Sequence, residues 1–201
     1  MSKSDIQCVL DFWFAGSGMD SPRVDSRMDR WFGVDDSLDR QIREEFGDLV
    51  QKASDNKLMD WAETPEGCLA LIILLDQFRR NIYRGSAEAF TLDHMALKLC
   101  IDGTIAGDHK SLTAMQRLFY FMPLQHAESA AVQKKSVSIF QALAEDATDT
   151  LRETFLTTAQ FAELHHDIVV EFGRFPHRNA ALGRESTPEE RAFLEQPNSS
   201  F

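Results

Sequence analysis

Cysteine is scarce in this chain and shows no sign of pairing. The 201 residues include only Cys8, Cys68 and Cys100, an odd and widely spaced set that argues against a disulfide framework. Long apolar runs are also missing: the longest, CLALIILL from Cys68 to Leu75, is far shorter than the roughly 20 residues that span a bilayer. The first residues, MSKSDIQCVLDFWF, lack the clean apolar core of a signal peptide. These absences predict a cytoplasmic protein without a membrane segment.

Several catalytic and binding signatures are absent as well. There is no GxSxG elbow, no P-loop, no GxGxxG and no HExxH, which leaves serine hydrolase, NTPase, dinucleotide enzyme and zinc protease without support. The formal net charge of −11 repels nucleic acid, and the aromatic residues are not interleaved with basic ones as in a stacking platform. We therefore expect no cofactor, no metal and no nucleic-acid partner.

Strand alternation is not sustained anywhere, whereas apolar residues recur with the spacing of helices. The sequence predicts an all-α fold: a single helical domain over 1–201 with about eight or nine helices packed as antiparallel pairs. Helices are expected over about 5–15, 36–54, 65–83, 92–103, 112–122, 127–145 and 149–173, with a short one near Trp31 and a last one beginning at Pro188. Pro123 is expected to stop the helix over 112–122.

The helix from Pro65 changes character along its length. It is apolar all round over Leu69–Leu75, so it should be buried, and it then reads LLDQFRRNIYR. Four polar residues of that end share an arc of about 140°. They are Asp76, Gln77, Arg80 and Asn81. Buried polar groups need partners, so the arc predicts either a ligand site or a structural Asp76–Arg80 pair one turn apart.

A second polar stretch, MPLQHAE, follows the helix over 112–122. Pro123 is expected to place His126 and Glu128 at the opening of the next helix. Glu128 in a first helical turn is favourable without any further role.

The third polar stretch is FAELHHDIVVEFGRFPHRN. His165 lies within the apolar arc of Phe161, Leu164, Ile168, Val169 and Phe172, whereas His166 lies outside it, so His165 should be mostly buried and His166 mostly exposed. Gly173 can end this helix in a left-handed turn, and Pro176 prevents its continuation. The resulting short loop should hold four polar side chains rigidly. They are Arg174, His177, Arg178 and Asn179.

Together, DFWF, LIILLDQFRRNIYRG, FMPLQHAE and FGRFPHRNAALGRESTPEE resemble the bacterial domain-of-unknown-function family numbered 924 over nearly the whole chain. The resemblance implies a tetratricopeptide-like array of helix pairs and no established activity. Its motif residues correspond here to Asp76, Gln77, Arg80, Asn81, Pro123, His126, Glu128, His165 and the run Arg174–Asn179. The chain departs from the usual family pattern at Arg79, Gln125 and Ala127, which leaves the main polar residues in place.

The resemblance and the polar clusters select the same residues. Six of the 21 basic residues fall in 79–84 and 174–184, and neither stretch contains an acid. Because arginine binds carboxylate and phosphate well, we expect the three clusters to meet around a pocket for a small anion or an acidic peptide group. One alternative is an enzyme acting on a small anionic substrate, with catalytic candidates His126, His165, His177 and Glu128. Another is a purely structural polar network.

Overall fold

The structure is a computed structural model that describes residues 4–14, 25–197 and 199. These residues form helices and no strand, as the sequence predicts. The α-helices are α1 (Asp5–Phe14), α2 (Asp25–Phe32), α3 (Asp36–Ser54), α4 (Pro65–Ile72), α5 (Arg79–Ile82), α6 (Asp93–Ala106), α7 (Ala114–Gln125), α8 (Ala130–Glu145), α9 (Asp149–Phe172) and α10 (Pro188–Leu194). With the continuous helix over 65–82 taken as one, the described part contains nine, within the expected range. Short 3₁₀ segments are η1 (Met59–Glu63), η3 (Ala87–Ala89), η4 (Asp108–Lys110) and η5 (Pro176–Arg178).

The buried centre is the helix from Pro65, as its apolar composition predicts. Every side chain over 67–75 is buried, and α1, α3, α6 and α7 surround this segment. Thr64 caps the helix by accepting a hydrogen bond from the backbone N–H of Gly67. Between α4 and α5 the helix widens into a π-helical segment, η2 (Ile73–Phe78). The widened turn offsets the residues that follow it from the 3.6-residue period assumed in the sequence analysis.

Two helix boundaries differ from the prediction because neither Pro123 nor Gly103 ends its helix. Pro123 lies inside α7, which continues to Gln125; the proline stands so near the helix end that the missing donor disrupts only the last turn. As a result His126 ends α7, and α8 begins only at Ala130. Gly103 lies inside α6, and Gly107, with φ of +92°, provides the left-handed cap.

Gly103 is required by close packing. A Cβ added there would lie 2.1 Å from the hydroxyl oxygen of Tyr120 and 2.5 Å from Oδ2 of Asp108. Because α6 and α7 approach so closely, only hydrogen fits at this position.

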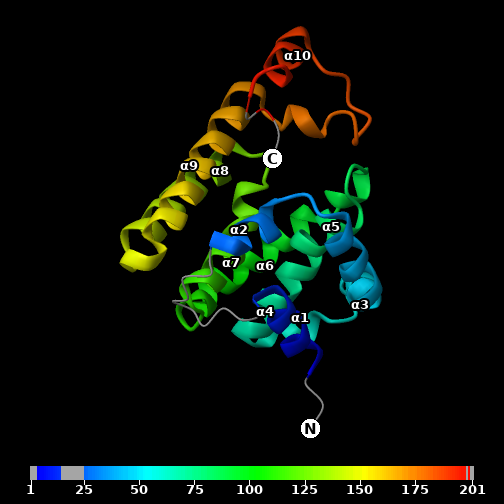
Figure 1. Cartoon of the computed structure of the whole chain (residues 1–201), viewed down its shortest axis with the longest axis vertical. Coiled ribbons are helices and arrows are strands. Elements are labelled where there is room, and N and C mark those ends of the chain that lie inside the picture. The colour runs from blue at the N-terminus through cyan, green and yellow to red at the C-terminus, as the bar shows by residue number, and fades with distance from the viewer. Residues whose placement is uncertain (1–3, 15–24, 198, 200–201) are drawn as a thin grey trace.

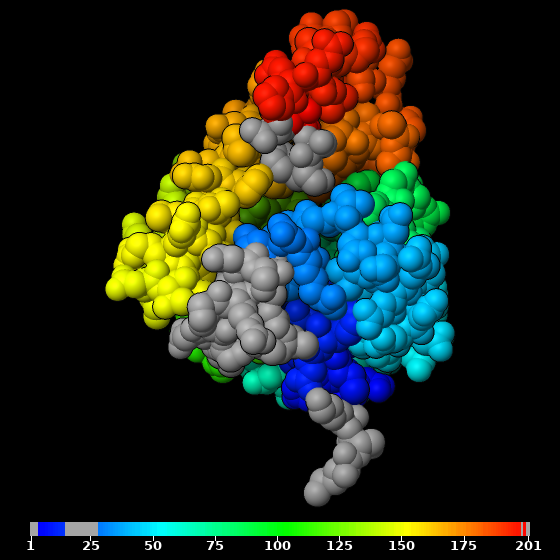
Figure 2. Space-filling model, in the orientation of Figure 1, coloured from blue at the N-terminus to red at the C-terminus, as the bar shows by residue number. Residues whose placement is uncertain are grey.

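The C-terminal third forms a layer beside the main body. Helices α8 and α9 lie side by side along one flank, and α10 lies beyond the end of α9 (Figure 1). Gly173, with φ of +72°, ends α9 and turns the chain into η5. Figure 2 shows the orange and red C-terminal segment above the blue and cyan helices, with a recess in the surface between them.

The apolar arc assigned to α9 is only partly confirmed. His165, Ile168 and Val169 are buried, but Phe161 and Leu164 are about 40% exposed, at 41% and 39%. The side chain of His166 is 30% exposed, more than that of His165 but less than we expected. The difference arises because α9 packs mainly on α8 and only slightly on the body, so the arc that it buries is narrow. Over the described ranges, no helix combines the length and apolar character that crossing a bilayer requires.

Candidate functional site

Asp76 is the centre of the polar network. It lies in the π-helical turn, is fully buried, and accepts hydrogen bonds at Oδ1 from Nδ1 of His126 (2.7 Å) and Nη2 of Arg80 (3.1 Å). Its Oδ2 accepts from Nε2 of Gln77 at 2.6 Å. Burial raises the pKa of Asp76, but its close contacts with His126 and with the charged Arg80 outweigh burial and hold the pKa well below its usual range. Asp76 is therefore an ionised, acceptor-only carboxylate.

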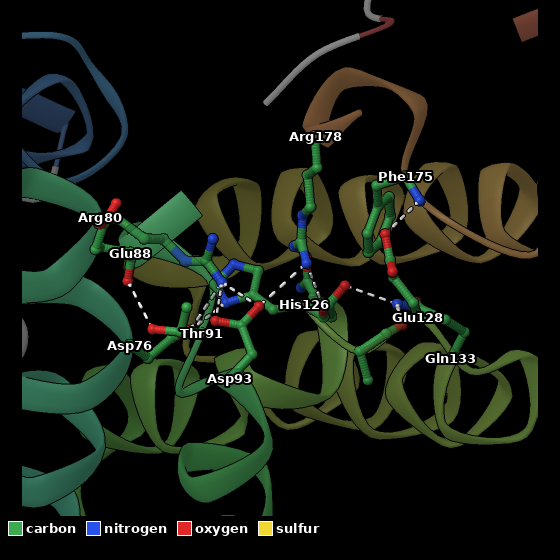
Figure 3. Close-up of polar contacts among 12 residues, drawn as sticks. Asp76, Arg80, Glu88, Thr91, Asp93, His126, Glu128, Gln133, Phe175 and Arg178 are labelled. Carbon is green, nitrogen blue, oxygen red and sulfur yellow. Dashed lines mark hydrogen bonds and ion pairs between the residues drawn. The ribbon is translucent and has the colours of Figure 1, made fainter. Parts of the chain in front are cut away.

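Asp93 joins this network to the loop after α9. It opens α6 and accepts from Nη2 of Arg80 at 2.9 and 3.0 Å and from Nη1 of Arg178 at 3.1 Å. The same Nη1 of Arg178 donates to the backbone carbonyl of His126 at 3.1 Å. Figure 3 shows the side chains of Arg80, Asp93, His126 and Arg178 converging from four segments. The first, second and third polar stretches thus meet, as predicted.

Two aromatic rings hold the guanidinium groups in place. The Cζ atom of Arg178 lies 4.8 Å from the ring centre of Phe90 and 4.4 Å from that of Phe175. The Cζ atom of Arg80 lies 5.3 Å from the centre of the same Phe90 ring. These distances are typical of cation–π contacts, so the rings of Phe90 and Phe175 hold the guanidinium groups of both arginines in position.

Hydrogen-bonding capacity remains on both arginines. Arg80 uses only Nη2 and Arg178 only Nη1 among the described residues. The Nε of each is buried and makes no hydrogen bond to the described residues. The remaining terminal nitrogens, Nη1 of Arg80 and Nη2 of Arg178, likewise make no hydrogen bond to the described residues. Each guanidinium therefore keeps unused donors, and the side chain of Arg80 is the more accessible of the two, at 21% exposed against 5% for Arg178.

Charge in the cluster is balanced. Two carboxylates, Asp76 and Asp93, face two guanidinium groups, Arg80 and Arg178. Burial and the neighbouring Arg80 lower the pKa of Arg178 to about 10, so it stays charged at neutral pH. Burial and Arg80 also lower the pKa of His126 below its ordinary value, which makes this ring neutral at pH 7. A ligand would therefore meet unused donors in a site of no net charge.

His165 and His177 lie at the edge of the cluster, beside Phe175. Their rings lie 5.4 and 5.6 Å from that of Phe175, and the ring of His165 is 6.5 Å from that of His126. Nδ1 of His165 donates to the carbonyl of Phe161 at 2.7 Å. Burial lowers the pKa of His165 to about 3 and that of His177 to about 4. Both rings are uncharged at neutral pH.

Glu128 fastens the loop after α9 to the turn before α8. It accepts from the backbone N–H of Phe175 at 2.8 Å and pairs with both terminal nitrogens of Arg184, at 2.7 and 2.9 Å. These contacts with Phe175 and Arg184 hold the loop in place, which indicates a positioning role for Glu128.

Three of the predicted site residues point to other partners. Arg174 makes a two-point pair with Glu190 at 2.6 and 2.8 Å, and Asn179 donates to the same Glu190 at 3.2 Å. Asn81 donates to Asp39 on α3 at 2.7 Å. Asn81 stands about 140° from Asp76 on an ideal helix, at the edge of the predicted polar arc, and there it faces α3.

Two cavities in the described part lie outside the cluster. One of about 310 Å³ is lined by Asp36, Asp39, Arg40, Arg43, Asn81, Ile82 and Arg84, and one of about 550 Å³ lies between α8 and α9 beside Lys134, Glu163 and His166. Neither is lined by Asp76, Arg80, His126 or Arg178. Among the described residues, no three histidine, cysteine, aspartate or glutamate side chains lie together in a way that could hold a metal ion.

Asp93 and Phe90 were missed by sequence reasoning. Asp93 reads as a favourable first-turn acid of a helix, and Phe90 reads as one more core aromatic among fifteen phenylalanines. The unmatched charge of Arg178 was the one signal that an additional acid must lie nearby.

Comparison with known proteins agrees with this architecture. The sequence model of DUF924, described as a bacterial protein of unknown function, matches residues 9–198. The chain is similar to the solved structure of a protein of unknown function from Agrobacterium tumefaciens, with 35% sequence identity and a TM-score of 0.78. That similarity covers 94% of this chain and 96% of the other. A search of curated proteins found no match.

Proposed function

This chain belongs to the DUF924 family of bacterial proteins of unknown function, and we propose that it binds a small anion between Arg80 and Arg178. The unused donors of these two arginines carry the proposal. Each guanidinium keeps a terminal nitrogen and a buried Nε without a hydrogen bond to the described residues. Carboxylate and phosphate oxygens are the acceptors that suit such donors.

Several features favour binding at this position. Cation–π contacts with Phe90 and Phe175 hold the guanidinium groups in position, so little side-chain entropy remains to be lost when an anion binds. The side chain of Arg80 is 21% exposed and that of His126 14%, which gives an anion access from one side. The balanced charge predicts moderate affinity, because Asp76 and Asp93 already neutralise part of the field.

The polar network also suits a purely structural role, because each carboxylate in it is paired. Thermal unfolding of the wild type and of Arg178→Gln, in sulfate or acetate at constant total ionic strength, distinguishes the two roles. Binding predicts that the anions raise the melting temperature of the wild type and that Arg178→Gln removes this rise. A structural role predicts a lower melting temperature for the variant and no specific anion effect in either protein.

Arg174→Gln is the matched control for this experiment. Arg174 is also an arginine of the loop after α9, but it pairs with Glu190 away from the cluster. The control should lose stability yet keep the anion-dependent rise. Loss of the rise in Arg174→Gln would move the anion site to the Glu190 side of the loop.

A further inference from the structure

His126 is held in one tautomer by Asp76. The carboxylate of Asp76 is ionised and can only accept, so the 2.7 Å contact places a hydrogen on Nδ1 of His126. In the neutral ring the other nitrogen, Nε2, then carries a lone pair and no hydrogen. The side chain of His126 is 14% exposed, and Nε2 makes no hydrogen bond to any residue that the structure describes.

This tautomer conflicts with an anion at the cluster. An anion such as sulfate only accepts hydrogen bonds, and the lone pair on Nε2 would repel it. Arg80 and His126 share the same oxygen of Asp76, at 3.1 and 2.7 Å, so an anion on the unused nitrogen of Arg80 lies close to the imidazole. The conflict disappears when Nε2 takes up a proton and becomes a third donor.

The charges that face His126 allow this change. Asp76 from η2 and Asp93 from α6 stabilise a charged imidazole, whereas Arg80 from α5 and Arg178 from η5 oppose it. His165 from α9 and His177 from η5 are neutral neighbours at pH 7. Before an anion binds, burial and Arg80 prevail and His126 is neutral. A bound anion adds a negative charge on the open side and offsets the effect of the arginines.

We propose that His126 takes up one proton from solvent at Nε2 for each anion bound, with Asp76 as the positioning residue that orients the ring. This inference rests on the proposed anion site. The new N–H bond forms on the imidazole lone pair, and the resulting imidazolium lies between the Asp76 carboxylate and the anion. The preferred ligands are therefore oxyanion groups without a hydrogen-bond donor of their own, such as an ionised carboxylate or a sulfate-like group.

Calorimetric titration with sulfate tests this proposal, because sulfate does not titrate near neutral pH. At pH 7 the titration is repeated in buffers of different ionisation enthalpy, so that the dependence of the heat on the buffer counts the protons taken up. We expect an uptake that approaches one proton per sulfate. We also expect affinity to rise as pH falls, by up to about tenfold per unit while His126 is neutral in the free protein and charged in the complex.

Two variants assign the proton. His126→Gln should bind sulfate more weakly and without proton uptake, whereas His166→Gln, a partly exposed histidine on α9, should behave as the wild type. Sulfate binding without proton uptake in the wild type would overturn the proton linkage and leave the anion site standing. Uptake that persists in His126→Gln would overturn the assignment to His126. No sulfate binding at any pH would overturn the anion site itself.

Discussion

Asp93 and Arg178, 85 residues apart in the chain, are joined by a hydrogen bond of 3.1 Å between Oδ2 and Nη1. Through this contact the start of α6 holds the loop that follows α9, and Arg178 is thereby placed beside His126. The side chain of Arg178 is only 5% exposed, so this pair is largely removed from solvent. Removing one member of such a pair destabilises a protein more than replacing both members by apolar residues. The reason is that the remaining member keeps a buried charge without a partner.

Substitution of Asp93 by alanine should therefore destabilise the protein by about 3 kcal/mol, the lower end of the range for breaking a buried ion pair. Urea unfolding measures the change. Asp149→Ala is the control, because Asp149 forms its ion pair with Arg152 in full solvent exposure and should contribute little. Equal small losses in the two variants would contradict the structural importance of the Asp93–Arg178 pair.

Gly103→Ala should destabilise by roughly 1–3 kcal/mol, because the added methyl group would overlap the hydroxyl of Tyr120 and the carboxylate of Asp108. Gly47→Ala, in the middle of α3, has no atom within 4 Å of the added Cβ and should stabilise by about 1 kcal/mol through helix propensity. Thermal melts of the two variants should shift in opposite directions. A melting temperature of Gly103→Ala that is unchanged or raised would show that α6 and α7 lie farther apart than described.

The buried histidine of α9 should affect stability and the partly exposed one should not. His165→Ala should cost about 1–3 kcal/mol, because the carbonyl of Phe161 loses its donor, and His166→Ala should change stability little. The pKa of His165 in the folded protein is about 3, below its unfolded value, so folding disfavours its protonation. The free energy of unfolding should therefore decrease as pH falls from about 6.5 towards 3, because the unfolded protein binds this proton and the folded protein does not. His165→Ala should reduce this dependence on pH. Urea titrations of both variants at pH 7 and pH 4.5 measure these differences.

Glu190 should contribute to the loss of folding stability at acidic pH. Its pKa is lowered to about 2, chiefly by the hydrogen bonds from Arg174, so its contribution is complete above about pH 4.5 and is lost as pH falls to about 2. Unfolding curves between pH 6 and pH 2.5 should show a smaller loss of stability in Glu190→Gln than in the wild type. Parallel curves for the two proteins would show that Glu190 is not an ionised partner of Arg174.

The parts of the fold that were predictable carry local signals. The starts of α3 and α10 follow from the N-cap Asp35 and from the Thr187–Glu190 capping box, and the residues themselves encode these caps. The π-helical turn at Ile73–Phe78 has no such signal, because tertiary packing selects it. The sequence predicted the Asp76–Arg80 contact correctly, whereas Asn81 bonds to Asp39 on α3 instead of joining them.

In the candidate site, too, the predictable residues are those with a local signal in the sequence. Arg80, His126 and Arg178 stood out as polar residues in apolar or acid-free surroundings, and they do meet. Glu190, by contrast, has a complete local role in the capping box, so its second role as the partner of Arg174 could not be read from spacing. Asp93 was hidden in the same way by its place in a first helical turn. The tetratricopeptide-like arrangement of the helix pairs stays a prediction.

Equilibrium binding of sulfate shows directly whether Arg80 and Arg178 bind one anion. At pH 6.5 and fixed ionic strength, we expect saturable binding of one sulfate per chain. Arg80→Gln and Arg178→Gln should each weaken it roughly tenfold or more, since a hydrogen bond to a charged group contributes about 1.5–3 kcal/mol. Arg174→Gln should leave the dissociation constant unchanged. Binding that is non-saturable, or equally strong in all four proteins, would contradict the account.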